Sequence, residues 1–147
     1  MSESLAITRA LGFRWREAID SANLAQIALD VGHLDDAEAH GREALVLAGA
    51  MNDRAVKIDS LGALALVAHA RGDEERAGRL WGAIEAEEAR APIGDWVLYR
   101  EDFETTLLAD ADAAFERGRE GGISTRSRRA SSGPCRTRVN ARTSGAR

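Results

Sequence analysis

The sequence predicts an all-α protein made of antiparallel helix pairs that stack side by side. Its apolar segments are rich in alanine and leucine, which favour helices, while the aromatic residues typical of strands make up only 5% of the chain. Glycines recur where helices should end, and the pattern repeats after 40 residues. With 147 residues, 44% of them hydrophobic, the chain suits one domain with a real core.

An internal repeat runs from residue 10 to residue 84. When the chain is laid on itself with a shift of 40, the superimposed positions keep one register and are mostly small or apolar: Gly32 with Gly72, Ala37 with Ala77, Leu24-Ala25 with Leu64-Ala65, and Ala28 with Ala68. A repeat of this length is typical of a helix–turn–helix unit that buries its apolar face against the next unit.

The first predicted helix pair covers residues 15–51, with helices near 15–31 and 35–48, and residues 1–14 are expected to be the end of a preceding helix or a linker. Small residues such as Ala18 and Ala25 form a narrow stripe that lets two helices approach closely. Gly32 falls where the first helix must end, because glycine adopts a left-handed conformation without a steric clash.

The second predicted pair covers residues 52–91, with helices near 54–70 and 74–90. Gly72 ends the first of these helices, and Asp73 is placed to cap the second. Pro92 stops the pattern, because the residue before a proline disfavours the helical conformation.

Residues 92–120 are expected to form C-terminal capping helices, the first of them capped by Asp95. Together with the preceding helix, this segment holds most of the aromatic residues: Trp81, Trp96, Tyr99, Phe103 and Phe115. These rings could line a ligand pocket, but we favour a C-terminal core that holds a lid over the last repeat, as the terminal unit of a stack requires.

Residues 121–147 are expected to be a disordered tail rich in Arg, Ser and Gly. This tail holds seven arginines and no acid, for a charge of +7, whereas residues 1–120 hold 24 acids against 13 basic residues, for a charge of −11. Such a tail attracts nucleic-acid phosphates weakly and without sequence preference, since no aromatic residue interleaves with the arginines.

The glycine-to-alanine spacing resembles the tetratricopeptide repeat. Gly32-x-x-x-x-Ala37 and Gly72-x-x-x-x-Ala77 each follow a Leu-Ala pair, and Trp81 matches an aromatic position of the second helix. The long, alanine-rich unit is similar to the C-terminal repeats of large actinobacterial regulators, which join an ATPase domain to a LuxR-type DNA-binding domain or an adenylate-cyclase domain. The stretch GDEERAGRLWGAIEAEEARAPIGDWVLYREDFE, with the later FERGREGG, is similar to the end of such chains.

The resemblance implies a short right-handed tetratricopeptide-like solenoid and a fragment of a LuxR-type or cyclase-linked transcriptional regulator. The phosphate-binding loop, recognition helix and cyclase carboxylates of those regulators are not recognisable here, so none of those activities is expected. The arginine-rich tail stands where an acidic, leucine-rich last helix is usual. We therefore hypothesise a truncated or frame-disrupted remnant, which the neighbouring DNA would reveal.

The expected function is protein interaction without catalysis, so we expect no enzyme activity, no cofactor and no metal site. The histidines His33, His40 and His69 lack the spacing of helical zinc motifs, and Cys135 is the single cysteine. The carboxylates Glu85, Glu87 and Glu88 are expected to be solvated, because acid–base catalysis by such residues needs shaped burial.

A protein or peptide partner is expected on the inner face of the stack, lined by the first-helix residues Asn23, Gln26, Asp30 and Asp59. Self-association is also expected, because two units leave the N-terminal edge open. The alternative function is a small nucleic-acid-associated protein that acts through the basic tail. Since no apolar run spans a bilayer and no secretory signal is visible, we expect no membrane partner and a cytoplasmic location.

Overall fold

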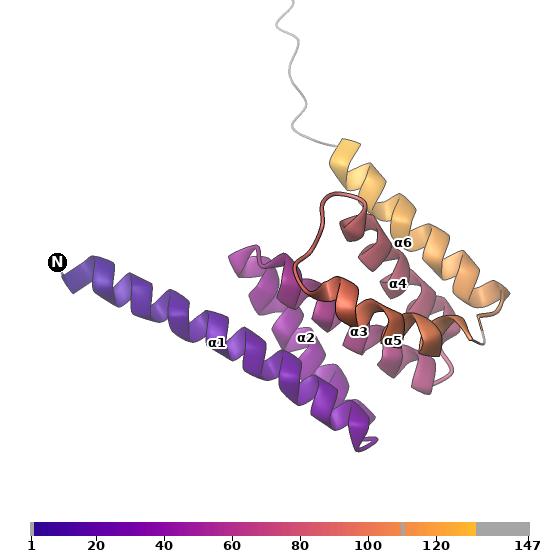
Figure 1. The fold of residues 1–147 in the computed structure, drawn as a ribbon, viewed down its shortest axis with the longest axis horizontal. Helices are drawn as coiled ribbons and strands as arrows, with labels where there is room; N and C mark the ends of the chain where they lie inside the picture. The colour runs from indigo at the N-terminus through magenta and orange to yellow at the C-terminus, as the bar shows by residue number, and fades with distance from the viewer. Residues whose placement is uncertain (1, 110, 132–147) are drawn as a thin grey trace, which may run out of the picture.

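The computed structural model describes residues 2–109 and 111–131, and every regular element in these residues is an α-helix (Figure 1). The six helices are α1 (Ser2–Asp30), α2 (Leu34–Met51), α3 (Arg54–Ala70), α4 (Glu74–Glu88), α5 (Trp96–Leu108) and α6 (Ala113–Ser131). The all-α class is therefore confirmed for the described part of the chain. Within the same residues, no helix combines the length and the apolar character that crossing a lipid bilayer requires.

The turns between α1 and α2 and between α3 and α4 are built alike. Gly32 has a φ of 80° and Gly72 a φ of 77°, a region that side chains with a Cβ rarely adopt. In each turn, the amide that follows the glycine donates to a carbonyl five residues earlier, at 2.8 and 2.9 Å. The two glycines end their helices as the sequence predicts.

Aspartates precede four of the helices and cap three of them, and before α6 the cap is Asp112, which accepts a hydrogen bond from the amide of Phe115 at 2.9 Å. Asp53 accepts a hydrogen bond from the amide of Val56 at 3.1 Å, and Asp73 accepts one from the amide of Arg76 at 3.3 Å. The predicted cap at Asp73 is therefore confirmed. The predicted cap at Asp95 is wrong, because its backbone (φ −81°, ψ 4°) lacks the extended conformation that turns a side chain back to the helix amides.

Helix α1 is longer than predicted. We expected residues 1–14 to be the end of a preceding helix or a linker, whereas α1 runs without a break from Ser2. Gly12 is the only strong helix breaker in this part of the chain, and one glycine in a helix costs only about 1 kcal/mol. The continuous helix therefore extends well beyond the rest of the molecule (Figure 1).

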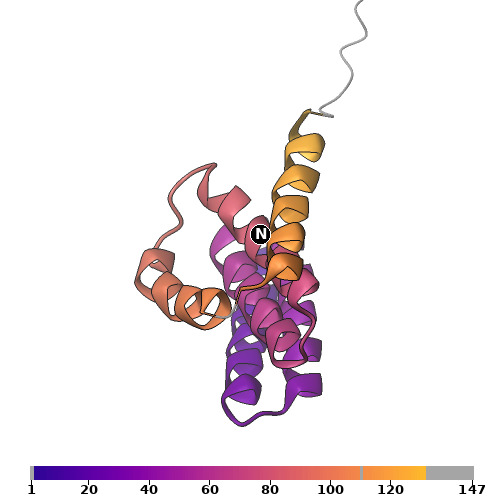
Figure 2. The same ribbon diagram turned by 90° about the vertical axis from the view of Figure 1, so that its right-hand side faces the viewer.

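The helices pack in the order of the chain, with α1 against α2, α2 against α3 and α3 against α4. Helix α1 also contacts α3, so the first helices of the two predicted pairs are neighbours. Beyond them, α5 packs on α3, while α6 packs on α4. The last two helices therefore flank the α3–α4 pair on two sides (Figure 2).

Glycines bring the backbones of α4 and α6 into contact. A Cβ atom added at Gly78 would lie 1.9 Å from the carbonyl oxygen of Phe115, and one added at Gly118 would lie 1.8 Å from that of Glu75. Gly82 and Gly122 make the same close approach one turn later in each helix, so the two helices run parallel. The sequence analysis expected the C-terminal helices to end at residue 120, so the contact at Gly122 was not predicted.

The predicted start of the disordered tail at residue 121 is wrong, because α6 continues through Ser131. Gly122 still contacts α4, where an added Cβ would lie 2.2 Å from the carbonyl oxygen of Arg79. This contact stabilises the helix beyond the point where its composition alone would predict disorder. The rest of the predicted tail, residues 132–147, lies outside the described residues.

The main core lies where α3, α4, α5 and α6 meet. Trp81 and Phe115 are fully buried there, and Trp96 is nearly so. The guanidinium of Arg100 lies 5.2 Å from the centre of the Trp81 ring, which adds a cation–π contact. The favoured interpretation of these rings as a packed C-terminal core is therefore confirmed, except that Tyr99 stays exposed.

Glu87 is fully buried, so the expectation that it is solvated is wrong. Its carboxylate accepts hydrogen bonds from Arg54 at 3.3 Å and from Lys57 at 2.9 Å. Arg54 also donates to the backbone carbonyls of Glu87 and Ala91, at 2.7 and 3.2 Å. This network fastens the start of α3 to the end of α4 and to the loop before α5.

Candidate interaction groove

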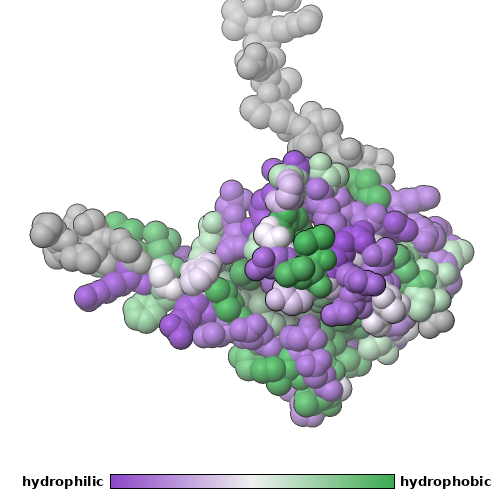
Figure 3. All heavy atoms as spheres, in the orientation of Figure 1, coloured by the Kyte–Doolittle hydropathy of each residue, from purple (hydrophilic) through white to green (hydrophobic). Residues whose placement is uncertain are grey.

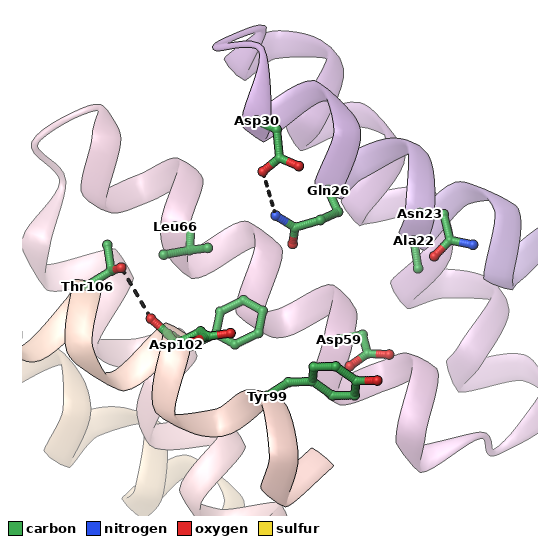
Figure 4. Close-up of a pocket in the computed structure, with 10 residues that line it drawn as sticks. Ala22, Asn23, Gln26, Asp30, Asp59, Leu66, Tyr99, Asp102 and Thr106 are labelled. Carbon is green, nitrogen blue, oxygen red and sulfur yellow. Dashed lines mark hydrogen bonds between the residues drawn. The ribbon is translucent and has the colours of Figure 1, made fainter. Parts of the chain in front are cut away.

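The helices α1, α3 and α5 enclose a groove of about 650 Å³ (Figure 4). We call it the interaction groove. It is lined from α1 by Ala22, Asn23, Gln26 and Asp30, from α3 by Asp59 and Leu66, and from α5 by Tyr99, Asp102, Phe103 and Thr106.

All four residues predicted to meet a partner line this groove. Asn23, Gln26 and Asp30 lie on one face of α1, and Asp59 faces them from α3 (Figure 4). The Gln26 side-chain amide donates a hydrogen bond to the Asp30 carboxylate at 3.2 Å. The structure thus brings the predicted set together, because α1 and α3 are neighbours in the stack.

The α5 wall was missed as a site by the sequence analysis. Tyr99, Asp102, Phe103 and Thr106 follow the spacing i, i+3, i+4, i+7, which places them on one side of a helix. The Thr106 hydroxyl donates to the backbone carbonyl of Asp102 at 3.2 Å, so it is held against its own helix. This spacing was the available signal, but nothing in the sequence places that side of α5 opposite α1.

The floor of the groove is apolar. Phe103 lies across Gly62 of α3, where an added Cβ would lie only 2.9 Å from the ring. Leu66, one turn later, is half-buried beside it. Glycine at position 62 is what lets α5 approach α3 closely enough to close the groove.

The walls carry negative charge, since the lining residues include three aspartates and no lysine, arginine or histidine. The surrounding chain withdraws the Asp59 carboxyl from part of the solvent, although the residue as a whole is exposed. This desolvation, together with the negative charge of Asp53, raises the pKa of Asp59 to about 6. Asp59 is therefore mostly charged at neutral pH but close to its titration range.

The other side chains that could perform chemistry lie apart from the groove. His69 pairs with Glu74 at 2.8 Å, and His33 lies 3.9 Å from Asp36. Among the residues that the structure describes, no three His, Cys, Asp or Glu side chains gather as a metal site would require. Cys135 lies outside the described residues.

Glu85 and Glu88, which were expected to be solvated, are instead half-buried in ion pairs. Arg119 of α6 donates to both carboxylate oxygens of Glu85, at 2.5 and 2.9 Å. Arg100 of α5 donates to Glu88 at 2.7 Å. These carboxylates therefore connect α4 to α6 and to α5, and they leave the groove as the best candidate site.

Comparisons with known proteins add no family to this description. No family model matches the chain, and no curated protein and no solved structure matches it either.

Proposed function

We propose that this protein is a non-catalytic helical-repeat module that binds a segment of a partner protein in the interaction groove. The observation that carries the proposal is that three helices line one open groove with an apolar floor and polar walls. Its volume of about 650 Å³ lies within the range of roughly 300–1,000 Å³ that is usual for ligand sites. Asn23 and Gln26 supply amides that can bond to an extended peptide backbone.

The partner segment that fits best carries basic side chains beside an apolar one. Asp30, Asp59 and Asp102 attract lysine or arginine, while Leu66 and Phe103 offer an apolar surface. A free peptide carboxylate fits poorly, because none of the described basic side chains lines the groove to receive it.

The proposed architecture is a short right-handed tetratricopeptide-like solenoid. Support comes from the shared turns at Gly32 and Gly72, and from α1, α3 and α5 lying side by side along one groove. On this interpretation α6 corresponds to α4 in a third unit, since Gly78 and Gly82 of α4 recur after 40 residues as Gly118 and Gly122 of α6. Helix α5 corresponds to α3, on which it packs, and it lies on the other side of the α3–α4 pair from α6 (Figure 2).

Selection from a peptide display library tests the proposal on the full chain. Peptides selected by the natural protein are then measured against Thr106→Arg, which places a bulky cation in the groove. The matched control is Thr105→Arg, since Thr105 is also exposed but lies outside the lining. We expect the groove variant to bind at least ~10-fold more weakly, a loss of about 1.4 kcal/mol, while the control binds normally.

Two results would refute the groove as the site. One is selection of peptides without basic residues that bind Thr106→Arg as well as they bind the natural chain. The other is failure of the full chain to enrich any peptide over a protein-free surface.

The biological role that we propose is regulation, as a fragment of a LuxR-type or cyclase-linked transcriptional regulator acting in the cytoplasm. Support for this role comes from the repeat spacing and from the stretch between Gly72 and Glu104, which is similar to the end of such chains. Upstream ATPase or DNA-binding coding sequence in the neighbouring DNA is the expected finding. An intact gene without such sequence would contradict this role.

A second candidate function is weak nucleic-acid binding through the basic tail, favoured by the seven arginines and the lack of acids in residues 121–147. Filter binding of duplex DNA at two salt concentrations tests it, with and without residues 132–147. If the tail acts, affinity falls steeply with salt and drops on deletion, which removes four of the seven arginines. Undiminished binding by the shortened chain would exclude residues 132–147 as its cause.

A further inference from the structure

Helix α1 carries a second apolar face that nothing in the described structure covers. Its packed face holds the buried residues Ala18, Ser21, Ala25 and Ala28. Roughly 100° around the helix from this face lies an exposed row that we call the outer stripe: Ala6, Ala10, Phe13, Leu24, Ile27 and the adjoining Val31. Phe13 is 73% exposed, Ile27 57% and Val31 61%. Apolar residues are visible along the projecting helix in Figure 3.

The outer stripe has the spacing of a coiled-coil seam. From Ala6 to Val31 its positions, with Glu17 and Asp20 between the two apolar halves, are separated alternately by four and three residues. A stripe with this period stays on one side of a helix and fits against a second helix over many turns. Phe13 on one side of the two acids, and Leu24 and Ile27 on the other, are large exposed apolar side chains, and apolar surface grouped in this way marks an interaction site.

The charges of α1 are divided between its two halves. Arg9, Arg14 and Arg16 lie in the N-terminal half, where residues 6–16 contain no acid. Residues 17–30 contain Glu17, Asp20 and Asp30 and no basic residue. Two such helices repel each other when parallel, because like halves meet, and attract each other when antiparallel.

We propose that two copies of this chain pair through antiparallel α1 helices along the outer stripe. In the register centred between Ala18 and Ile19, Phe13 of one copy lies opposite Leu24 of the other, and Ala10 lies opposite Ile27. The same register brings Arg9, beside the stripe, to Asp30 of the second copy. Each contact occurs twice, as the twofold symmetry of an isologous dimer requires. This inference rests on the outer stripe of α1, and Asp30 is the one residue of the interaction groove that it uses.

The centre of the pair is its weakest part. Glu17 of one copy lies opposite Asp20 of the other, so four carboxylates meet near the twofold axis, with the two Arg16 side chains beside them. Removing one charge per copy with Asp20→Asn should therefore tighten the dimer. Lower salt reduces screening and therefore strengthens both this central repulsion and the Arg9–Asp30 attraction.

Sedimentation velocity of the full chain tests the pairing. At about 100 µM the natural protein should sediment as a dimer of the 15.8 kDa chain. Phe13→Glu and Ile27→Glu should raise the dimer dissociation constant at least ~100-fold. The control Val46→Glu replaces a residue on α2 that is 72% exposed and lies off the stripe, and it should leave the dimer intact.

Disulfide trapping tests the orientation, in a background with Cys135→Ser. Ala10→Cys and Ile27→Cys should form a mixed disulfide when the two variants are combined, and little disulfide when each is alone. Trapping of Ala10→Cys with itself would show a parallel pair and overturn the proposal. The proposal would also be overturned if the natural chain is monomeric, or if the dimer is insensitive to both stripe variants. In either case the outer stripe does not bind a second copy of the chain.

Discussion

At the scale of single residues, the buried Glu87 makes the sharpest stability prediction. Glu87→Gln keeps the size of the side chain but removes the charge that pairs with Arg54 and Lys57. Both cations are largely buried, so losing their partner should lower the free energy of unfolding by about 2 kcal/mol. Urea denaturation followed by circular dichroism measures the change.

A surface ion pair of α4 serves as the control for that prediction. Glu75 lies 3.7 Å from Arg79, and both side chains are more than half exposed. Glu75→Gln should change the free energy of unfolding by less than about 0.5 kcal/mol, because water screens exposed pairs. Equal losses from the two substitutions would show that burial of Glu87 contributes nothing.

The raised pKa of Asp59 predicts how the groove responds to pH. Asp59 is charged above a pH of about 6 and becomes neutral below it, so the attraction for a basic peptide weakens as the pH falls through this value. Isothermal titration of a selected peptide between pH 7.5 and pH 5 should show affinity falling by about 10-fold, the scale of one lost ion pair. Asp59→Asn should flatten the profile, and an unchanged slope in that variant would refute the assignment.

At the scale of elements, the contact of α4 with α6 depends on glycine. An added methyl group at Gly78 would overlap the carbonyl of Phe115, and backbone cannot move aside as a flexible side chain can. Gly78→Ala should therefore destabilise the fold by about 3 kcal/mol or detach α6. Thermal denaturation, together with the helical content of the folded protein, distinguishes these results.

Gly49 of α2 gives the matched control, because nothing lies within 4 Å of a Cβ atom added there. Gly49→Ala should raise the stability by about 0.5–1 kcal/mol through helix propensity alone. If Gly78→Ala is stabilising to the same degree, the two helices do not touch at this position.

The elements show which signals a single sequence carries. Turns at Gly32 and Gly72 could be predicted, because a left-handed residue ends a helix through local geometry. The extent of α6 could not be predicted, because it depends on the contact with α4. The internal repeat predicted from the sequence ends at residue 84 and therefore does not include α6. Glu87 was placed in solvent for a similar reason: its burial comes from Arg54 and Lys57, which lie 33 and 30 residues away.

At the scale of the whole molecule, the groove was half predictable. The inner face of the stack follows from the repeat, which is why Asn23 and Asp59 were expected to face a common partner. The α5 wall was not predictable, because an aromatic helix that closes a core and one that lines a groove look alike in sequence. Phe103 does both, since it packs against Trp96 at 5.3 Å and borders the groove.

The cores beneath the helices are unequal, and this predicts a gradient of local stability. The cluster around Trp81 joins α3, α4, α5 and α6 with large side chains, whereas α1 rests on small clusters built mainly from alanine such as Ala18 and Ala44. Smaller buried surfaces contribute less free energy, so α1 should open most readily.

Hydrogen exchange read by mass spectrometry measures this gradient. At low protein concentration, amides of α3 and α4 should be the most protected and those of α1 before residue 15 the least, because no helix in the described part of the chain covers that half of α1. Raising the concentration should slow exchange in α1 alone if two copies pair there, while α3 and α4 keep their rates. The substitution Phe13→Glu should abolish this concentration dependence, because Phe13 lies in the proposed contact between the two copies. A concentration dependence that persists in this variant would have to come from another surface.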